Sequence, residues 1–182
     1  RAQVAARAEY RIAGANAFFS ERAVTRGELT PQLPQDGGRL ALAATDSLRL
    51  QGRLAPNSGS GRNSLVDITA AELSIVNTLN PNATAVELLA DDLQGLGAES
   101  LLIGGTRTLN DDAMTLSVGA QRVTVQSGVT LSAPELMLAG TDRVIVNGSL
   151  LANGGEVSAI PISFAPNANG TPRLFVFESA ST

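Results

Sequence analysis

Two adjacent acid pairs, Asp91-Asp92 and Asp111-Asp112, are the side chains of this sequence that come nearest to a catalytic or metal-binding arrangement. The chain contains no Cys, His or Lys, which excludes thiolate and imidazole nucleophiles and zinc sites built on Cys or His. A calcium site would need further carboxylates from neighbouring strands, because Ca²⁺ takes six or more oxygen ligands. Both pairs fall in predicted turns, where Asp is locally favoured. We therefore predict no catalytic residue, metal or cofactor, and keep a polysaccharide lyase or hydrolase as the enzyme alternative.

Charge and hydropathy exclude two further classes of partner. The formal net charge is −4, and the 13 basic residues are all Arg, scattered singly along the chain. A nucleic-acid interface would need them clustered on one face. No run of about 20 apolar residues is present, so no membrane span is predicted. The absence of Cys suits a chain that is threaded unfolded through a secretion pore, and the first residue, Arg1, suggests a fragment of a longer protein.

The elements that must position any site come from an internal repeat. The segment Arg122–Leu131 reappears as Arg143–Leu150, a period of 21 residues, and Ser47–Leu54 is an earlier copy. Each copy is an aliphatic strand, an amide residue, a small residue and another aliphatic residue. Such a unit cannot bury its apolar face alone, so neighbouring copies must stack. The repeat predicts an all-β chain folded as a β-solenoid, with a β-sandwich as the alternative fold.

We expect the 182 residues to form a single domain fragment. Residues 1–38 are predicted to be an irregular, capping or flap segment with a short strand or two, residues 39–164 regular coils, and residues 165–182 the last coil or an edge. The expected strands are 40–42, 48–50, 65–68, 73–76, 86–89, 101–103, 114–118, 123–125, 129–131, 136–138, 144–146, 157–164 and 173–177. Pro161 must stand at an edge or corner, because proline lacks a ladder donor.

Two sets of polar residues are candidates for a role. Gln51, Gln126 and Asn147 occupy the same place in their copies, and stacked amides can bond one another along a structural ladder. Three polar loops, 57–63, 106–112 and 166–172, are predicted to leave the solenoid, and such excursions cluster on binding faces. The candidate contact residues in these loops are Asn57, Arg62, Asn63, Arg107, Asn110, Asp111, Asp112, Asn167 and Asn169.

Four segments suggest a family when they are taken in order: Asp36–Gly52, Val66–Ile68, Ala98–Arg107 and Ala133–Val146. The phrase Ser100-Leu-Leu-Ile-Gly-Gly-Thr-Arg107 is the most specific part. The succession resembles the shaft of large bacterial exoproteins of the filamentous haemagglutinin family. That resemblance implies a right-handed parallel β-helix, exported by a dedicated outer-membrane transporter in a two-partner system.

The function expected from this resemblance is a non-catalytic segment of a secreted adhesin on the bacterial cell surface. Its loops would contact a glycan or protein receptor on a host cell or other surface. A mechanical spacer, which holds a distant adhesive or toxic tip away from the cell, is the alternative. The two differ in whether the loops or the number of coils determine adhesion.

Overall fold

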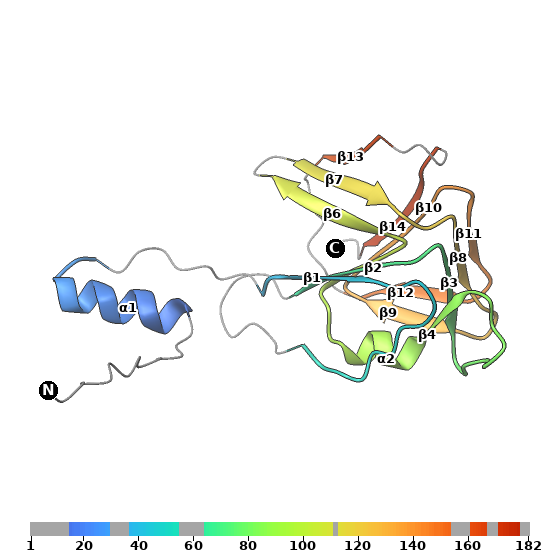
Figure 1. The fold of residues 1–182 in the computed structure, drawn as a ribbon, viewed down its shortest axis with the longest axis horizontal. Coiled ribbons are helices and arrows are strands. Elements are labelled where there is room, and N and C mark those ends of the chain that lie inside the picture. Colours follow the sequence, from blue (N-terminus) through green and yellow to red (C-terminus); the bar gives the residue numbers. More distant parts are fainter. Residues whose placement is uncertain are drawn as a thin grey trace, which may run out of the picture. The chain divides into compact units, whose positions relative to one another are not determined.

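The computed structural model describes residues 15–29, 37–54, 64–110, 113–153, 161–166 and 171–178. The chain divides into two compact units, Arg1–Gln35 and Asp36–Thr182. The first unit contributes one helix, and every described strand belongs to the second, which is mostly β (Figure 1). Neither of the described helices has the length and apolar character that crossing a bilayer requires.

Helix α1 (Ala15–Arg26) takes the place of the short strands expected in this segment, and that expectation was wrong. The helix ends at Gly27, where a positive φ of 67° allows two closing hydrogen bonds. The Gly27 N–H donates to the Val24 carbonyl at 3.1 Å, and the Glu28 N–H donates to the Ala23 carbonyl at 2.9 Å. This is a Schellman motif, which favours glycine because glycine has no Cβ. Gly27 is thus the stop signal that identifies the helix.

Two sheets form the body of the second unit. Sheet A has the strand order β1-β2-β5-β10-β14, with parallel pairs except for β14, which is antiparallel to β10. Sheet B has the order β11-β8-β3-β4 and its pairs are parallel. The bounds in sheet A are β1 (Arg39–Ala43), β2 (Leu65–Thr69), β5 (Ser100–Ile103), β10 (Glu135–Gly140) and β14 (Arg173–Glu178). Those in sheet B are β3 (Glu72–Val76), β4 (Val86–Leu89), β8 (Arg122–Val125) and β11 (Arg143–Val146).

The remaining elements form two smaller sheets and a short helix. Strands β9 (Thr130–Ala133) and β12 (Ser149–Ala152) form a parallel pair. Strand β7 (Ala113–Val118) pairs antiparallel with β6 (Gly105–Asn110) and parallel with β13 (Ile162–Phe164). Helix α2 (Ala90–Gly95) follows β4 directly. In Figure 1, β6, β7 and β13 lie on one side of the second unit, and α2 lies on the opposite side.

The register of the stacked strands confirms the 21-residue repeat. Arg122 of β8 lies opposite Arg143 of β11, and Leu131 of β9 lies opposite Leu150 of β12. Both alignments follow from matching the two copies in sequence. The earlier copy, residues 47–54, forms no strand, although three of its leucines pack against the core.

Sheet A has a longer repeat because two excursions interrupt the stack. Leu65 of β2 lies opposite Ser100 of β5, and Ser100 lies opposite Glu135 of β10, so each step spans 35 residues. The first step contains β4 and α2, and the second contains the β6–β7 hairpin. The rungs therefore keep their register while the connections between them vary in length.

Sheet A is buried on both faces where β2, β5 and β10 lie side by side. Leu101 and Ile103 point into the main core, which residues of β3, β8 and β9 also line. Leu102 and Met137 point the other way, into a second cluster completed by residues of β7. A strand covered on both faces needs apolar residues at successive positions, which explains the run 101–103.

Three expectations about local structure need correction. Residues 106–110 form strand β6, whereas a loop over 106–112 was expected. Asp91 and Asp92 stand in the first turn of α2, where their charges interact favourably with the positive end of the helix, whereas a turn was expected. Residues 48–50 form no strand. Pro161 stands directly before β13, and residues 157–160 of the strand expected there lie outside the described part.

The edge of β10 is occupied by a strand of opposite direction. Strand β14 pairs antiparallel with β10 along its whole length, from Arg173 opposite Gly140 to Glu178 opposite Glu135. The expectation for residues 165–182 was a last coil or an edge. A further parallel rung would pair at this same edge of β10, so β14 takes the position of that rung.

Gly104 is the point where the chain leaves sheet A and to which it returns. Its N–H donates to the Ile68 carbonyl at 2.7 Å, which continues the ladder between β2 and β5. Its carbonyl accepts from Gly119 at 3.0 Å and from Ala120 at 2.9 Å. The 14 residues between Gly104 and Gly119 are therefore closed off as a hairpin at a single peptide carbonyl.

We predict that Gly104→Ala destabilises the protein by about 2 kcal/mol or more. Gly104 has a φ of 108°, and a Cβ built there would stand 1.8 Å from the Ala139 carbonyl oxygen. Gly52→Ala is the matched control, because nothing lies within 4 Å of its Cβ position, and it should change stability by less than about 0.5 kcal/mol. Urea unfolding measures both. Equal midpoints for the two variants would contradict this account of the hairpin's closure.

Candidate functional site

The β6–β7 hairpin is held on the outer face of sheet A by a buried arginine. Arg107 of β6 is only 1 % exposed, and its side chain meets Asp67, the fully buried middle residue of β2. The Arg107 Nε donates to Asp67 Oδ1 at 2.6 Å, and the Arg107 backbone N–H donates to Asp67 Oδ2 at 3.0 Å. One carboxylate thus binds both the side chain and the main chain of the hairpin strand.

The other nitrogens of the Arg107 guanidinium are also engaged. One donates to the Ser100 hydroxyl at 2.6 Å and lies 3.7 Å from a Glu135 carboxylate oxygen. The other donates to the Val66 carbonyl at 3.4 Å. Ser100 and Glu135 lie opposite each other in the register of β5 and β10, so successive rungs of sheet A supply the partners. We call Arg107, Asp67, Ser100, Glu135 and Arg39 the Arg107 cluster.

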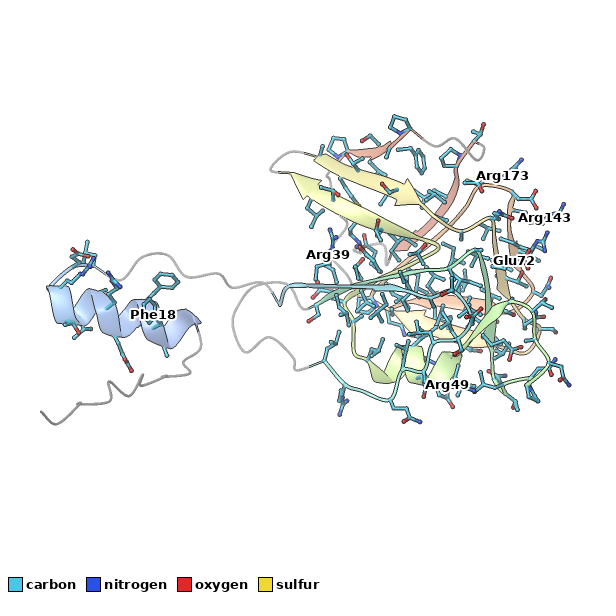
Figure 2. The ribbon with its side chains drawn as sticks, viewed as in Figure 1. Phe18, Arg39, Arg49, Glu72, Arg143 and Arg173 are labelled. Atoms are coloured by element: carbon cyan, nitrogen blue, oxygen red, sulfur yellow. The ribbon has the colours of Figure 1, made fainter. Side chains whose placement is uncertain are left out.

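Arg39 brings a second positive charge to the cluster from strand β1. Its Nε lies 3.5 Å from Asp67 Oδ2, and its guanidinium also donates to the Arg107 carbonyl. Figure 2 shows Arg39 on the side of β1 that faces the hairpin. The cluster therefore contains two guanidinium groups and two carboxylates, and among the described residues no buried side-chain polar atom is left without a partner.

This arrangement supports structure and not proton transfer or metal binding. The Asp67 carboxylate already accepts from Arg107 and neighbours Arg39, so it has no free position toward a substrate. In the described part of the chain, no group of three or more His, Cys, Asp or Glu side chains is placed to hold a metal ion. The physical role left to the cluster is to fix the hairpin at one position over sheet A.

The face of the hairpin that points away from sheet A carries hydroxyl groups. The inward residues of β7, such as Met114 and Leu116, are buried in the second apolar cluster. The alternate residues form two rows across the strands. Thr108 of β6, Thr115 of β7 and Ser163 of β13 form one row, and Thr106 and Ser117 form the other. Thr115 and Ser163 share a hydrogen bond of 3.2 Å between their hydroxyl oxygens.

The structure places the predicted contact residues differently from one another. Arg107 is buried in the cluster and is not a loop residue, so its prediction as an exposed contact was wrong. Asn110 is the last residue of β6, beside the turn of the hairpin. The other candidates lie outside the described residues: Asn57, Arg62, Asn63, Asp111, Asp112, Asn167 and Asn169.

The predicted amide ladder is divided between different partners. Gln126 and Asn147 directly follow Val125 and Val146, which lie opposite each other in the register. The side-chain amide of Gln126 donates to the Ser74 hydroxyl at 3.1 Å, and the Asn147 backbone N–H donates to the Val125 carbonyl at 2.9 Å. Gln51 lies in the segment that forms no strand, so it is not a rung of the same sheet.

Sequence reasoning did not single out Asp67, the residue that holds the site together. The signal was present, because Val66-Asp67-Ile68 places one carboxylate inside an apolar strand. A charge at such a position must have a partner, since an isolated buried charge is very costly. What the sequence could not reveal was that Arg107, 40 residues away, is that partner.

We predict that Asp67→Asn destabilises the protein by about 3–5 kcal/mol, because it leaves the buried guanidinium of Arg107 without its main counter-charge. Glu72→Gln is the control: it breaks the exposed pair that Glu72 forms with Arg122 at 3.2 Å, and it should cost less than about 1 kcal/mol. Glu72 and Arg143 lie on the surface of sheet B (Figure 2).

Urea unfolding of the two variants gives the comparison, and limited proteolysis at the hairpin reports whether Asp67→Asn releases it. A cost for Asp67→Asn as small as that for Glu72→Gln would show that the cluster does not hold the hairpin.

Comparison with known proteins adds no relative to this site. No protein-family model, curated protein or solved structure matches the chain. A function must therefore be inferred from the chain's own residues.

Proposed function

We propose that the chain is a non-catalytic segment of a secreted bacterial adhesin, in which stacked strands form a shaft and the β6–β7 hairpin is presented from it. The observation that carries the proposal is the hairpin itself. It is an excursion from regular rungs, it is fixed by the buried Arg107–Asp67 pair, and its outer face is uncharged and rich in hydroxyl groups. A rigidly held projection loses little conformational entropy when it binds a partner.

For the shaft we propose a right-handed parallel β-helix. Among the described strands, eight of the ten pairings are parallel, whereas a β-sandwich is built from antiparallel strands. Like residues also stack in register, as Arg122 does with Arg143. The right hand follows from the general rule for connections between parallel strands of one sheet.

The proposed location is the bacterial cell surface, reached through a dedicated outer-membrane transporter. Support comes from the resemblance of segments such as Ser100–Arg107 to filamentous haemagglutinin-family exoproteins. The absence of Cys agrees with export as an unfolded chain. The proposed partner is a glycan or protein receptor on a host cell or other surface, and neither nucleic acid nor membrane insertion is part of the proposal.

A mechanical spacer is the second candidate function. The observation that favours it is the continuous apolar core, which runs through sheet A, sheet B and β9 and which repeats from rung to rung. A spacer would use this core alone, and the hairpin would only cover the outer face of sheet A.

Charged substitutions on the hairpin should separate the two functions. We predict that Thr108→Asp combined with Ser117→Asp lowers adhesion of the protein to cells at least tenfold, because both side chains are exposed on the outer face and the added charges would be desolvated on contact. Ser149→Asp, at an exposed position of β12, adds charge away from the hairpin and should leave adhesion unchanged.

The measurement is the binding of labelled protein to host cells and to immobilised glycans and proteins, with unfolding midpoints as a check on folding. Adhesion of the full-length parent that survives the hairpin variant but falls when rungs are deleted would establish the spacer instead.

A further inference from the structure

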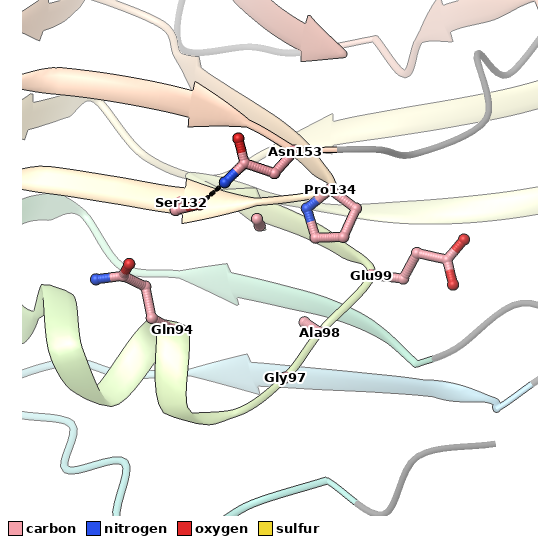
Figure 3. A pocket seen from close by; sticks show the side chains of 8 residues that line it. Gln94, Gly97, Ala98, Glu99, Ser132, Pro134 and Asn153 are labelled. Carbon is pink, nitrogen blue, oxygen red and sulfur yellow. Dashed lines mark hydrogen bonds between the residues drawn. The ribbon is translucent and has the colours of Figure 1, made fainter. Parts of the chain in front are cut away.

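A second feature, separate from the hairpin, is a pocket of about 330 Å³ at the corner between α2 and the end of β9. Figure 3 shows Gln94 of α2 on one side, with Ser132, Pro134 and Asn153 on the other. Glu99 stands at the rim. This volume is at the lower end of the range for small-molecule sites, about 300–1,000 Å³.

The floor of the pocket is apolar and its backbone is fixed. Ala98 and Ala133 are both buried beneath it, and Pro134 adds the face of its ring. The Glu99 backbone N–H donates to the Ser64 carbonyl at 3.0 Å, and the Glu99 carbonyl accepts from the Glu135 N–H at 2.9 Å. The corner is therefore bonded to the rungs on both sides, and the pocket exists before any ligand binds.

The polar groups around this floor are mostly hydrogen-bond acceptors. The Gln94 side-chain amide nitrogen donates to the Ala90 carbonyl at 3.2 Å and to the Thr130 carbonyl at 3.3 Å, so both of its hydrogens are used and its oxygen remains to accept. The Asn153 amide nitrogen donates to the Ser132 hydroxyl at 2.8 Å. This bond leaves the Asn153 oxygen as an acceptor and frees the Ser132 hydrogen to donate.

The charge around the pocket excludes some ligands. Its lining contains one carboxylate, Glu99, and no arginine, so an anionic ligand would meet acceptors and a negative charge. A cation would gain little from a single half-exposed carboxylate, because water screens that interaction. A neutral molecule with several hydroxyl groups can donate to the two amide oxygens and accept from Ser132, while its C–H face packs on Pro134.

We propose that this corner pocket binds one residue of a neutral saccharide, with Gln94, Ser132 and Asn153 bonding its hydroxyl groups and Pro134 beneath its apolar face. The proposal deepens the adhesin function by naming a ligand class, and it rests on that function only for the biological source of the saccharide. Binding to one pocket of this size is expected to be weak, with Kd near the millimolar range, about −4 kcal/mol.

The test is an NMR titration of the whole chain with neutral oligomers of glucose, galactose and N-acetylglucosamine. Matched arms use a uronic-acid oligomer and a Lys-rich peptide. Gln94→Ala and Asn153→Ala change exposed side chains and should each weaken neutral-saccharide binding at least tenfold with unchanged unfolding midpoints. Asn77→Ala is the control, because Asn77 is an exposed amide that bonds the Gly128 carbonyl away from the pocket, and it should bind as the wild type does.

The outcomes separate this inference from the adhesin proposal. Absence of neutral-saccharide binding by the wild type, equal binding by the pocket variants, or preference for the acidic oligomer or the peptide would overturn the pocket assignment. Loss of cell adhesion in the hairpin variant together with any of these results would leave the adhesin proposal standing. Saccharide binding that depends on Gln94 and Asn153, without adhesion to cells, would support the pocket and remove the adhesin function.

Discussion

The burial of one carboxylate, Asp67, is the constraint on which the outer layer of this structure depends. An apolar residue at this position of β2 would suit a sheet face covered by hydrocarbon, as Leu102 and Met137 do on the neighbouring rungs. Asp67 instead requires a cation, and the hairpin supplies Arg107. A buried pair of this kind adds little net stability compared with apolar packing, but it is strongly unfavourable when broken. It therefore selects one position of the hairpin over others.

The inner layer follows a different logic. Its aliphatic residues stack rung on rung, and their register is set by the strand period, because a slip of one residue would turn every side chain to the other face. Connections between rungs are free to vary, since a longer loop adds little closure entropy. This is why a helix can occupy one connection and a hairpin the next while Leu65, Ser100 and Glu135 stay aligned. Gly104 makes the second excursion possible by allowing the backbone to pass close to Ala139.

The sequence predicted the parts of the fold that depend on local period. The match of Arg122 with Arg143 predicted an observed register, and the aliphatic runs marked most of the strands. It did not predict β6, because Thr106, Arg107 and Thr108 form a strand only through pairing with β7 and burial against sheet A. The candidate site was missed for the same reason. A polar residue is normally read as exposed, and its burial depends on a partner distant in sequence.

The two layers together explain why binding is proposed at the excursions and not on the rungs. Side chains of the rungs are used to build the core, and those of sheet A are used on both faces. The hairpin and the α2 corner differ, because each is bonded to the rungs by its backbone or by a buried charge while its outer side chains face water. Such a site is preorganised, so little of its binding energy is lost in ordering it. A stack of uniform rungs offers only its edges for recognition, whereas these excursions offer shaped surfaces with fixed polar groups.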